Sequence, residues 1–388
     1  MKNSKLRIIV SGLMAQYPLG GVTWDYLQYV LGLARLGHDV YYLEDTGLWP
    51  FNPLEGGISE GCSFNVAYLS TVMSRFGLGE RWAYRFPHQS QWFGIPERER
   101  EMLITTADLL INVSSSLQNL AEYRKVKRLV YVDTDPVFTQ IKLANEQADF
   151  RKQVDMHDVC FSYGECLSET GFATGHRWYP MRKPIVLSEW ESSLPPRDVF
   201  TTVMNWTSYK NVTYKGKSYG QKDVEFMKYL DLPGMVAPLV LEMAIGSGKT
   251  RRAPRELLIH KGWKVVDPLR VCHDLDSYRQ YIQLSKAEWT VAKNGYVEGQ
   301  SGWFSGRSAC YLAAGRPIVV QDTGFASVIP TGEGVLTFKT LEESAAAMKE
   351  VNGHYQLHAK AARDIAEEYF DSGKVLSRLI EEAMNSNA

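Results

Sequence analysis

Hydrophobic positions along the chain follow two alternating patterns. Short runs rich in β-branched and aromatic residues alternate with longer segments in which apolar residues recur every three to four positions. This alternation is typical of βαβ units, in which helices join the parallel strands of a sheet and pack on it. In the first half of the chain the expected strands are residues 7–13, 40–43, 108–113, 129–133 and 159–163. The pattern therefore predicts an α/β fold with a parallel sheet.

The first expected helix covers residues 24–36 and stops at Gly37, a residue type that commonly ends helices. One face of this helix is aliphatic and is formed by Leu27, Val30, Leu31 and Ala34. Lysines and a short apolar stretch at the amino terminus also resemble a signal peptide. Because the apolar stretch is short and leads directly into Pro18, we interpret it as the first buried strand.

The second half repeats the alternation after residues 185–199, a proline-containing stretch without periodicity that we interpret as an interdomain linker. Strand patterns follow at 199–206, 239–246, 263–268, 288–294 and 316–322. Helical patterns follow at 222–229, 254–260, 275–284 and 306–314, with a long polar-faced helix at 355–384. A hairpin with Lys-Gly at its turn is expected in "NVTYKGKSYG". We expect an amino-terminal domain at 1–192, a carboxy-terminal domain at 197–365 and a terminal helix at 366–388 that packs back on the first domain.

Length and charge narrow the class of protein. The 388 residues exceed the roughly 250–300 that one core usually supports, so two domains with a cleft between them are expected. Forty-three basic and 44 acidic side chains give no overall attraction to nucleic acid or to anionic lipid. No apolar run is long enough to span a membrane, and the five cysteines form no Cys-x-x-Cys pair. We expect a cytoplasmic protein without stable membrane insertion.

A pair of glycines, Gly20 and Gly21, lies between the first strand and the first helix. Glycines let the backbone approach a ligand closely, and the amino-terminal end of the next helix favours an anion at the same place. Ligands of open α/β sheets bind beyond the carboxyl ends of the strands. We therefore expect a ligand site here. Because the pattern Gly-x-Gly-x-x-Gly is absent, the sequence does not support dinucleotide binding.

Two segments resemble one family of enzymes. The first is "PLGGVTWDYLQYVLGLARLGHDVYYLE", residues 18–44, which resembles the opening of the amino-terminal domain of GT-B glycosyltransferases. The second is "GWFSGRSACYLAAGRPIVVQDTG", residues 302–324, which is similar to the donor-site segment of the glycosyltransferase group 1 families. The resemblance implies a GT-B architecture, in which an acceptor domain and a nucleotide-sugar donor domain, both Rossmann-like, face each other across a cleft.

The same resemblance implies an activity. These enzymes transfer a sugar, here expected to be a hexose, from a nucleoside diphosphate sugar to an acceptor hydroxyl. A UDP-sugar is the expected co-substrate, with no metal and no other cofactor required. Retaining members commonly carry Glu-x7-Glu before Ala-x-Gly-x-Pro, and Gly302 and Cys310 occupy those positions here. This departure leaves the nucleotide and the stereochemical outcome open.

Donor contacts follow from the resemblance, which places Arg307 in the segment 302–324 and implies a lysine near the start of the first helix of the second domain, in "GQKDVEFMKYL". Arg307 is expected to bind phosphate, for which a guanidinium is well suited. Lys222, or as second choice Lys210, is expected to stabilise the leaving diphosphate by its positive charge. As an alternative to a donor role, either lysine can be an ordinary surface charge, and Arg307 can be a solvated residue of its helix. The remaining expected donor contacts are Gly20, Gly21, Ser308, Asp322, Thr323 and Gly324.

Acceptor contacts are expected on the amino-terminal side. Asp25 follows the glycine pair and is the candidate general base on the acceptor hydroxyl, although an aspartate in a first helical turn also fits a helix-dipole interaction. Further expected contacts are Trp24, Asp133, Asp135 and His176. Asp133 and Asp135 also mimic the metal-binding Asp-x-Asp of GT-A enzymes. We favour the acceptor interpretation, because a second βαβ domain carries the donor-like segment.

Several alternatives remain. "AIGSGKT", residues 244–250, resembles a phosphate-binding loop, but Met243 stands where the pattern needs glycine. Nucleotide hydrolysis is therefore not expected, although Lys249 or Arg251 can still point toward the cleft. A nucleotide-sugar epimerase of the same fold and a non-catalytic sugar-nucleotide or glycan binder are the competing functions. The acceptor can be a glycan, a lipid, a natural product or a hydroxylated nucleobase.

Overall fold

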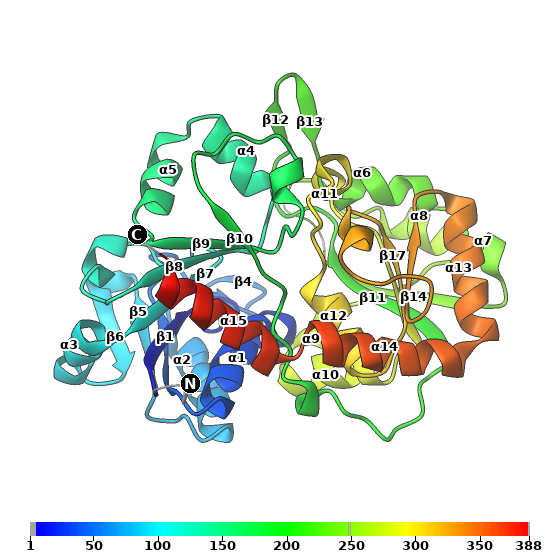
Figure 1. The fold of residues 1–388 in the computed structure, drawn as a ribbon. Helices are drawn as coiled ribbons and strands as arrows, with labels where there is room; N and C mark the ends of the chain where they lie inside the picture. Colours follow the sequence, from blue (N-terminus) through cyan, green and yellow to red (C-terminus); the bar gives the residue numbers. More distant parts are fainter. Residues whose placement is uncertain (1–4, 247, 249, 387–388) are drawn as a thin grey trace.

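Two β-sheets with flanking helices form the molecule in this computed structural model, which describes residues 5–386 except 247 and 249 (Figure 1). The first sheet has eight strands in the order β10-β9-β8-β7-β1-β2-β5-β6, and the second has six in the order β15-β14-β11-β16-β17-β18. All neighbouring strands are parallel except β5 and β6. The predicted α/β class is confirmed.

The strands that were expected from the hydrophobic runs form within a few residues of their predicted bounds. The first sheet consists of β1 (Arg7–Ser11), β2 (Asp39–Glu44), β5 (Trp82–Phe86), β6 (Gln91–Gly94), β7 (Leu109–Val113), β8 (Leu129–Asp133), β9 (Val159–Ser162) and β10 (Trp178–Pro180). The second consists of β11 (Val199–Asn205), β14 (Val240–Gly246), β15 (Lys264–Val266), β16 (Ala287–Thr290), β17 (Ile318–Gln321) and β18 (Val335–Phe338). The sequence patterns missed β5, β6, β10 and β18.

Helices cover both sheets. The helices between strands of the first sheet are α1 (Gly20–Arg35), α2 (Ser63–Arg75), α3 (Glu97–Thr106), α4 (Phe138–Ala144) and α5 (Ala148–Asp155). Those that follow β11 are α6 (Lys222–Phe226), α7 (Leu232–Val236), α8 (Arg255–His260), α9 (Pro268–Cys272), α10 (Leu275–Gln283), α11 (Asn294–Gly299), α12 (Gly306–Ala313), α13 (Leu341–Gly353), α14 (Tyr355–Tyr369) and α15 (Ser372–Asn385). No helix of the described residues is long and apolar enough to cross a membrane.

Two small hairpins lie outside the main sheets. One joins β3 (Phe51–Asn52) and β4 (Gly57–Ile58), and the other joins β12 (Val212–Tyr214) and β13 (Lys217–Tyr219). Lys215 and Gly216 at the second turn both have positive φ, 48° and 78°, as a two-residue hairpin turn requires. The predicted Lys-Gly hairpin is thus confirmed, and it projects at the junction of the two halves (Figure 1).

Two helices differ from their predicted bounds. Helix α1 begins at Gly20, so the glycine pair forms its first turn and is not a loop. The expected long terminal helix is two helices, α14 and α15, because the chain leaves the helical conformation at Phe370 and Asp371, where Asp371 pairs with Ile185. The amide of Ile185 donates to the Phe370 carbonyl at 2.7 Å, and the amide of Ser372 donates to the Ile185 carbonyl at 2.9 Å.

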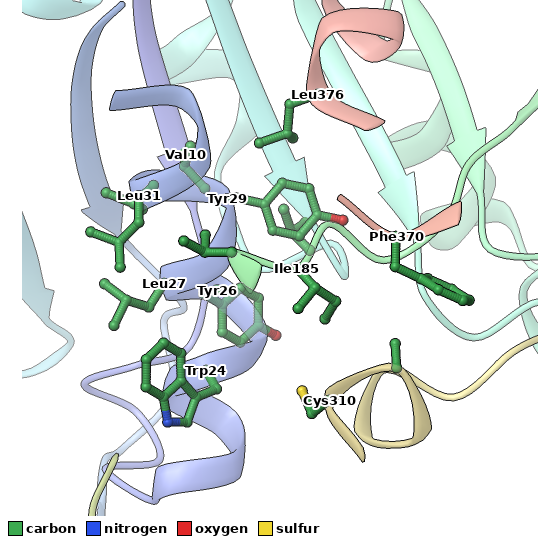
Figure 2. Close-up of a cluster of buried hydrophobic side chains, with 14 of the residues drawn as sticks. Val10, Trp24, Tyr26, Leu27, Tyr29, Leu31, Ile185, Cys310, Phe370 and Leu376 are labelled. Atoms are coloured by element: carbon green, nitrogen blue, oxygen red, sulfur yellow. The ribbon is translucent and has the colours of Figure 1, made fainter. Parts of the chain in front are cut away.

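The hydrophobic core passes from one half of the molecule to the other. Figure 2 shows part of this core, in which Tyr26 and Tyr29 of α1 lie near Ile185, Cys310 of α12 and Leu376 of α15. Helix α15 packs directly on α1, since a Cβ at Gly32 would lie 2.5 Å from a Leu376 methyl. The chain thus returns to the first half after completing the second sheet.

Candidate functional site

A cavity of about 450 Å³ lies between the two halves. Residues at or just beyond the carboxyl ends of strands line it: Ser114 after β7, Thr134 after β8, Asn205 of β11 and Gly246 of β14. Ligands of parallel α/β sheets bind at this edge, and the volume lies within the range of small-molecule sites. The cavity is therefore the candidate functional site.

Positive charge is concentrated on one wall of the cavity. Lys222, Lys293 and Arg307 all line it. Lys222 is half-buried at the start of α6, and no hydrogen-bond or ion-pair partner for its ammonium lies among the described residues. Burial and the charges of Arg307 and Lys293 hold the pKa of Lys222 well below its usual range, against the opposing effect of Glu288. An anion bound here would relieve this unfavourable arrangement.

Arg307 differs from Lys222 because its charge is balanced. Its Nε lies 2.5 Å from Oε1 of Glu288, Nη1 donates to the Val203 carbonyl at 2.5 Å, and Nη2 donates to the Thr290 hydroxyl at 3.0 Å. Glu288 is fully buried, and the Arg307 side chain is 14% exposed. Arg307 thus forms a fixed part of the cavity wall.

Two helices start at the cavity from opposite sides. Leu19 precedes α1 and Ser305 precedes α12, and neither side chain caps its helix. Both residues line the cavity, together with Gly21 and Gly306. The first amides of a helix have no partner within it and carry partial positive charge, so both helix ends add to the favourable environment for an anion.

A carboxylate faces this positive wall from α1. The side chain of Asp25 is 58% exposed, and its Oδ1 lies 3.2 Å from Nζ of Lys183. The Lys183 ammonium also donates to the Asp25 backbone carbonyl and lies 5.2 Å from the centre of the Tyr29 ring. Asp25 and Lys183 both line the cavity, which therefore presents an accessible carboxylate opposite a cationic pocket.

No family profile matches the sequence, and no curated protein matches it either. The structure, in contrast, resembles solved glycosyltransferases along almost the whole chain. An α-glucosyltransferase in complex with UDP has a TM-score of 0.58 at 14% identity, covering 98% of this chain and 100% of its own. The Anabaena protein HepE in complex with UDP-glucose has a TM-score of 0.58 at 12% identity, with coverage of 98% and 100%. A glycosyltransferase involved in avilamycin A biosynthesis has a TM-score of 0.55 at 12% identity, with coverage of 98% and 97%.

The chain has the GT-B fold. The resemblance deduced from the two sequence segments is thus confirmed for the architecture, with two Rossmann-like domains facing across a cleft. The cavity lies in this interdomain cleft of the GT-B fold, and the segments that carried the resemblance contribute both of its uncapped helix starts.

The GT-B cleft brings together three of the expected donor contacts. Gly21, Lys222 and Arg307 line the cavity. Gly20 lies beside them, but its position is needed for packing between the halves, since a Cβ there would lie 2.0 Å from the Asp274 carbonyl oxygen. Lys210 is exposed on the loop before β12 and does not line the cavity.

The other expected donor contacts lie behind the cavity wall. Ser308 is 1% exposed. Asp322 accepts a hydrogen bond from the Gly324 amide at 3.0 Å, and the Thr323 hydroxyl donates to the Trp303 carbonyl at 2.5 Å. The hydrogen bonds of Asp322 and Thr323 close the turn after β17 on itself. Contrary to the expectation, Ser308, Asp322, Thr323 and Gly324 do not line the cavity.

Two of the expected acceptor contacts, Trp24 and His176, lie away from the cavity. Trp24 is 1% exposed, packs on Trp190, and donates its indole N–H to the Leu275 carbonyl at 3.0 Å. Contrary to the expectation, Trp24 belongs to the core and does not line the cavity. His176 lies 2.7 Å from Asp155, away from the cavity, at a second hollow beside α15.

Asp133 and Asp135 also have partners that the sequence did not indicate. Asp133 is buried and accepts from the hydroxyls of Thr139 and Ser162 and from the Gln140 amide, which fixes the segment after β8. Asp135 accepts from groups of the opposite half. Neither carboxylate lines the cavity, and no group of three metal-ligating side chains is present in the part of the chain that the structure describes.

Two other sequence expectations concern local segments. The helix-dipole interpretation of Asp25 is wrong, because the first turn of α1 contains no acidic residue. In the phosphate-loop-like stretch, Lys249 lies outside the described residues, Arg251 pairs with Asp223 at 3.1 Å, and the next helix is the six-residue α8. This stretch lacks the long helix that a phosphate-binding loop requires.

Sequence reasoning missed Lys183 and Lys293. Lys183 follows β10 and Lys293 follows β16, in segments without a motif. Both reach the cavity because the strands before them end there. The sequence patterns did not reveal this, because β10 was missed and Lys293 fell inside the predicted strand 288–294.

Proposed function

We propose that this chain is a glycosyltransferase that transfers a sugar from a nucleoside diphosphate sugar to an acceptor hydroxyl in the interdomain cavity. The observation that carries the proposal is Lys222, a half-buried lysine that lines the same cavity as Asp25 and whose ammonium has no hydrogen-bond or ion-pair partner among the described residues. The ammonium suits a donor diphosphate and stabilises the leaving nucleoside diphosphate by charge. Structural similarity to proteins solved with UDP and UDP-glucose supports the same reading.

The donor is proposed to be a UDP-sugar bound mainly by the carboxy-terminal domain, residues 197–365. Lys222, Lys293 and the start of α12 supply positive charge without a bound metal ion. The acceptor is proposed to contact the amino-terminal domain, residues 1–192, with residues 366–388 packed on it. Contacts between the halves limit access of water, which protects the donor from hydrolysis. We propose a cytoplasmic location.

Asp25 is proposed to act on the acceptor. Its exposed carboxylate can accept the proton of the attacking hydroxyl, while Lys183 holds it in place. One similar structure contains DNA with an HMU base, and another belongs to avilamycin A biosynthesis. Hydroxylated nucleobases and natural products therefore join glycans and lipids in the acceptor screen.

The first experiment is calorimetric binding of UDP, GDP and ADP and their sugars, with Mg²⁺ and with EDTA. The wild-type protein is compared with Lys222→Met and with Lys210→Met as the matched control. We expect metal-independent binding of the uridine ligands, weakened in Lys222→Met alone. Equal loss in both variants, or no binding of any nucleotide, would contradict the proposal. Product formation from the donor without an acceptor would indicate the epimerase instead.

A further inference from the structure

Asp135 and Lys293 connect the two halves beside the cavity. Asp135 follows β8 of the first sheet, and Lys293 follows β16 of the second. The Lys293 Nζ lies 2.8 Å from Oδ1 of Asp135. The hydroxyls of Tyr209 and Tyr296, which also belong to the second half, donate to the same carboxylate. Three donors of one half thus converge on one acceptor of the other.

The Lys293 ammonium lies in an aromatic enclosure. Its Nζ is 4.5 Å from the ring centre of Tyr209 and 5.1 Å from those of Tyr296 and Phe138. Phe138 comes from α4 of the first half, so both halves build the enclosure. A cation over aromatic faces is stabilised by the ring quadrupoles, and more so when solvent is excluded. The side chain of Lys293 is 16% exposed.

One N–H of this ammonium remains free. Lys293 donates to Asp135 and, at 2.9 Å, to the Tyr209 hydroxyl, and no third acceptor lies among the described residues. An ammonium carries three donors. Lys293 and Tyr296 line the cavity, whereas Asp135, Tyr209 and Phe138 do not. The partners therefore hold Lys293 from behind while the residue itself forms part of the cavity wall.

We propose that Lys293 is a phosphate-binding residue of the donor site and that Asp135 is its positioning residue, so that the cationic wall is complete only when the two halves are closed. This inference rests on the proposed function. It explains why a carboxylate lies near a site for an anion. By positioning Lys293, Asp135 strengthens phosphate binding more than its own negative charge weakens it. Closure and donor binding then favour each other.

The test measures UDP and uridine affinity by calorimetry in Lys293→Met, Asp135→Asn and the double variant. Lys293→Met is expected to weaken UDP binding about ten- to a hundredfold and to leave uridine unchanged, since uridine has no phosphate. Asp135→Asn is expected to weaken UDP binding at least about threefold, although it removes a negative charge. In the Lys293→Met background, Asp135→Asn should no longer weaken UDP binding, because Asp135 acts by positioning the lysine.

The sign of the Asp135→Asn effect decides between two roles. A carboxylate that acted only as a nearby charge would repel the anion, so tighter UDP binding in Asp135→Asn would overturn the inference. Unchanged UDP affinity in Lys293→Met would overturn it too. If UDP binds and depends on Lys222 but not on Lys293, the inference fails while the proposed function stands. If no nucleotide binds the wild type, both fail.

Controls separate positioning from damage to the fold. Asp149→Asn removes an exposed carboxylate of α5 in the same half and should leave UDP affinity unchanged. Thermal unfolding of every variant shows whether it is folded. If Asp135→Asn does not fold, Tyr296→Phe removes one donor to Asp135 and keeps the ring packed, and the same weakening of UDP with unchanged uridine is expected.

Discussion

The Lys183 ammonium lies 3.2 Å from the Asp25 carboxylate, yet the two side chains differ in exposure, with 4% for Lys183 and 58% for Asp25. The lysine is thus a buried support for an accessible carboxylate. Gly306, at the start of α12, lies over both, since a Cβ there would be 3.3 Å from Lys183 and 3.4 Å from Asp25. Asp25 is in this way held from its own half and covered from the other.

Asp25→Asn is expected to lower turnover at least about a hundredfold, as loss of a general base does. It should also lower the free energy of unfolding by about 1–2 kcal/mol, a value reduced from that of a fully buried pair because Asp25 is exposed to solvent. Steady-state kinetics and urea unfolding measure the two effects. Turnover near that of the wild type would exclude Asp25 as the base.

Binding of UDP is expected to be coupled to proton uptake by Lys222. Burial and two neighbouring cations lower the pKa of Lys222, and a bound diphosphate is expected to raise it, so UDP binding should be accompanied by proton uptake as the pH rises. Calorimetry in buffers of different ionisation enthalpy at several alkaline pH values measures this uptake. Lys222→Met should lose it. The same proton stoichiometry in both proteins would contradict the assignment.

Arg307 and Lys222 should respond differently to truncation. Arg307→Met leaves the fully buried Glu288 without its partner and is expected to cost about 3–5 kcal/mol of unfolding free energy. Adding Glu288→Gln should recover part of this loss. Lys222→Met removes an unfavourable charge and should leave stability unchanged or raised. Denaturant unfolding of the four proteins checks the order, and equal effects of the two single variants would contradict it.

Glu44 should make stability fall as the pH rises. Its carboxyl is fully buried under the amides of Ala15 and Gln16, and burial raises its pKa to about 7 despite those hydrogen bonds. Between about pH 4.5 and 7 the folded protein keeps a proton that the unfolded chain has released, so folding loses free energy over this window. Relative to Glu44→Gln, the wild type should lose about 2–3 kcal/mol from pH 5 to pH 8.

The comparison must be made against Glu44→Gln because another buried group acts in the opposite direction. Burial lowers the pKa of His157 to about 4, so its contribution to stability falls as the pH falls from about 6.5 toward 4. That contribution is common to both proteins and cancels. Parallel pH profiles of unfolding free energy for the wild type and Glu44→Gln would show that Glu44 titrates normally.

Local sequence predicted much of the fold and a smaller part of the site. Buried strands are short apolar runs, and β8 was predicted to the residue. The helix start at Gly20 was missed because no capping residue marks it, and the glycine is required by the Asp274 carbonyl of the other half. Such a requirement depends on packing between segments far apart in the sequence, which no local pattern contains.

The site shows the same limit. Lys222 and Arg307, which line the cavity, were expected from the family resemblance: Arg307 lies in the segment 302–324, and Lys222 lies near the start of the first helix of the second domain. Lys293 and Asp135 are 158 residues apart, and their pairing depends on how two sheets face each other. Asp135 was expected to contact the acceptor because of its type and its place after a strand. Its three donors from the other half could not be foreseen, because a carboxylate bound by three donors and a free one look alike in sequence.

The chain crosses between the halves twice, and the crossings run side by side at Ile185 and Asp371. A double connection of this kind restricts twisting between the halves and leaves bending as the easy motion. It also means that the first half is not contiguous in the gene. A fragment ending near residue 192 would expose the α1 surface that Leu376 of α15 covers, so an isolated first half requires the last helix to be grafted onto it.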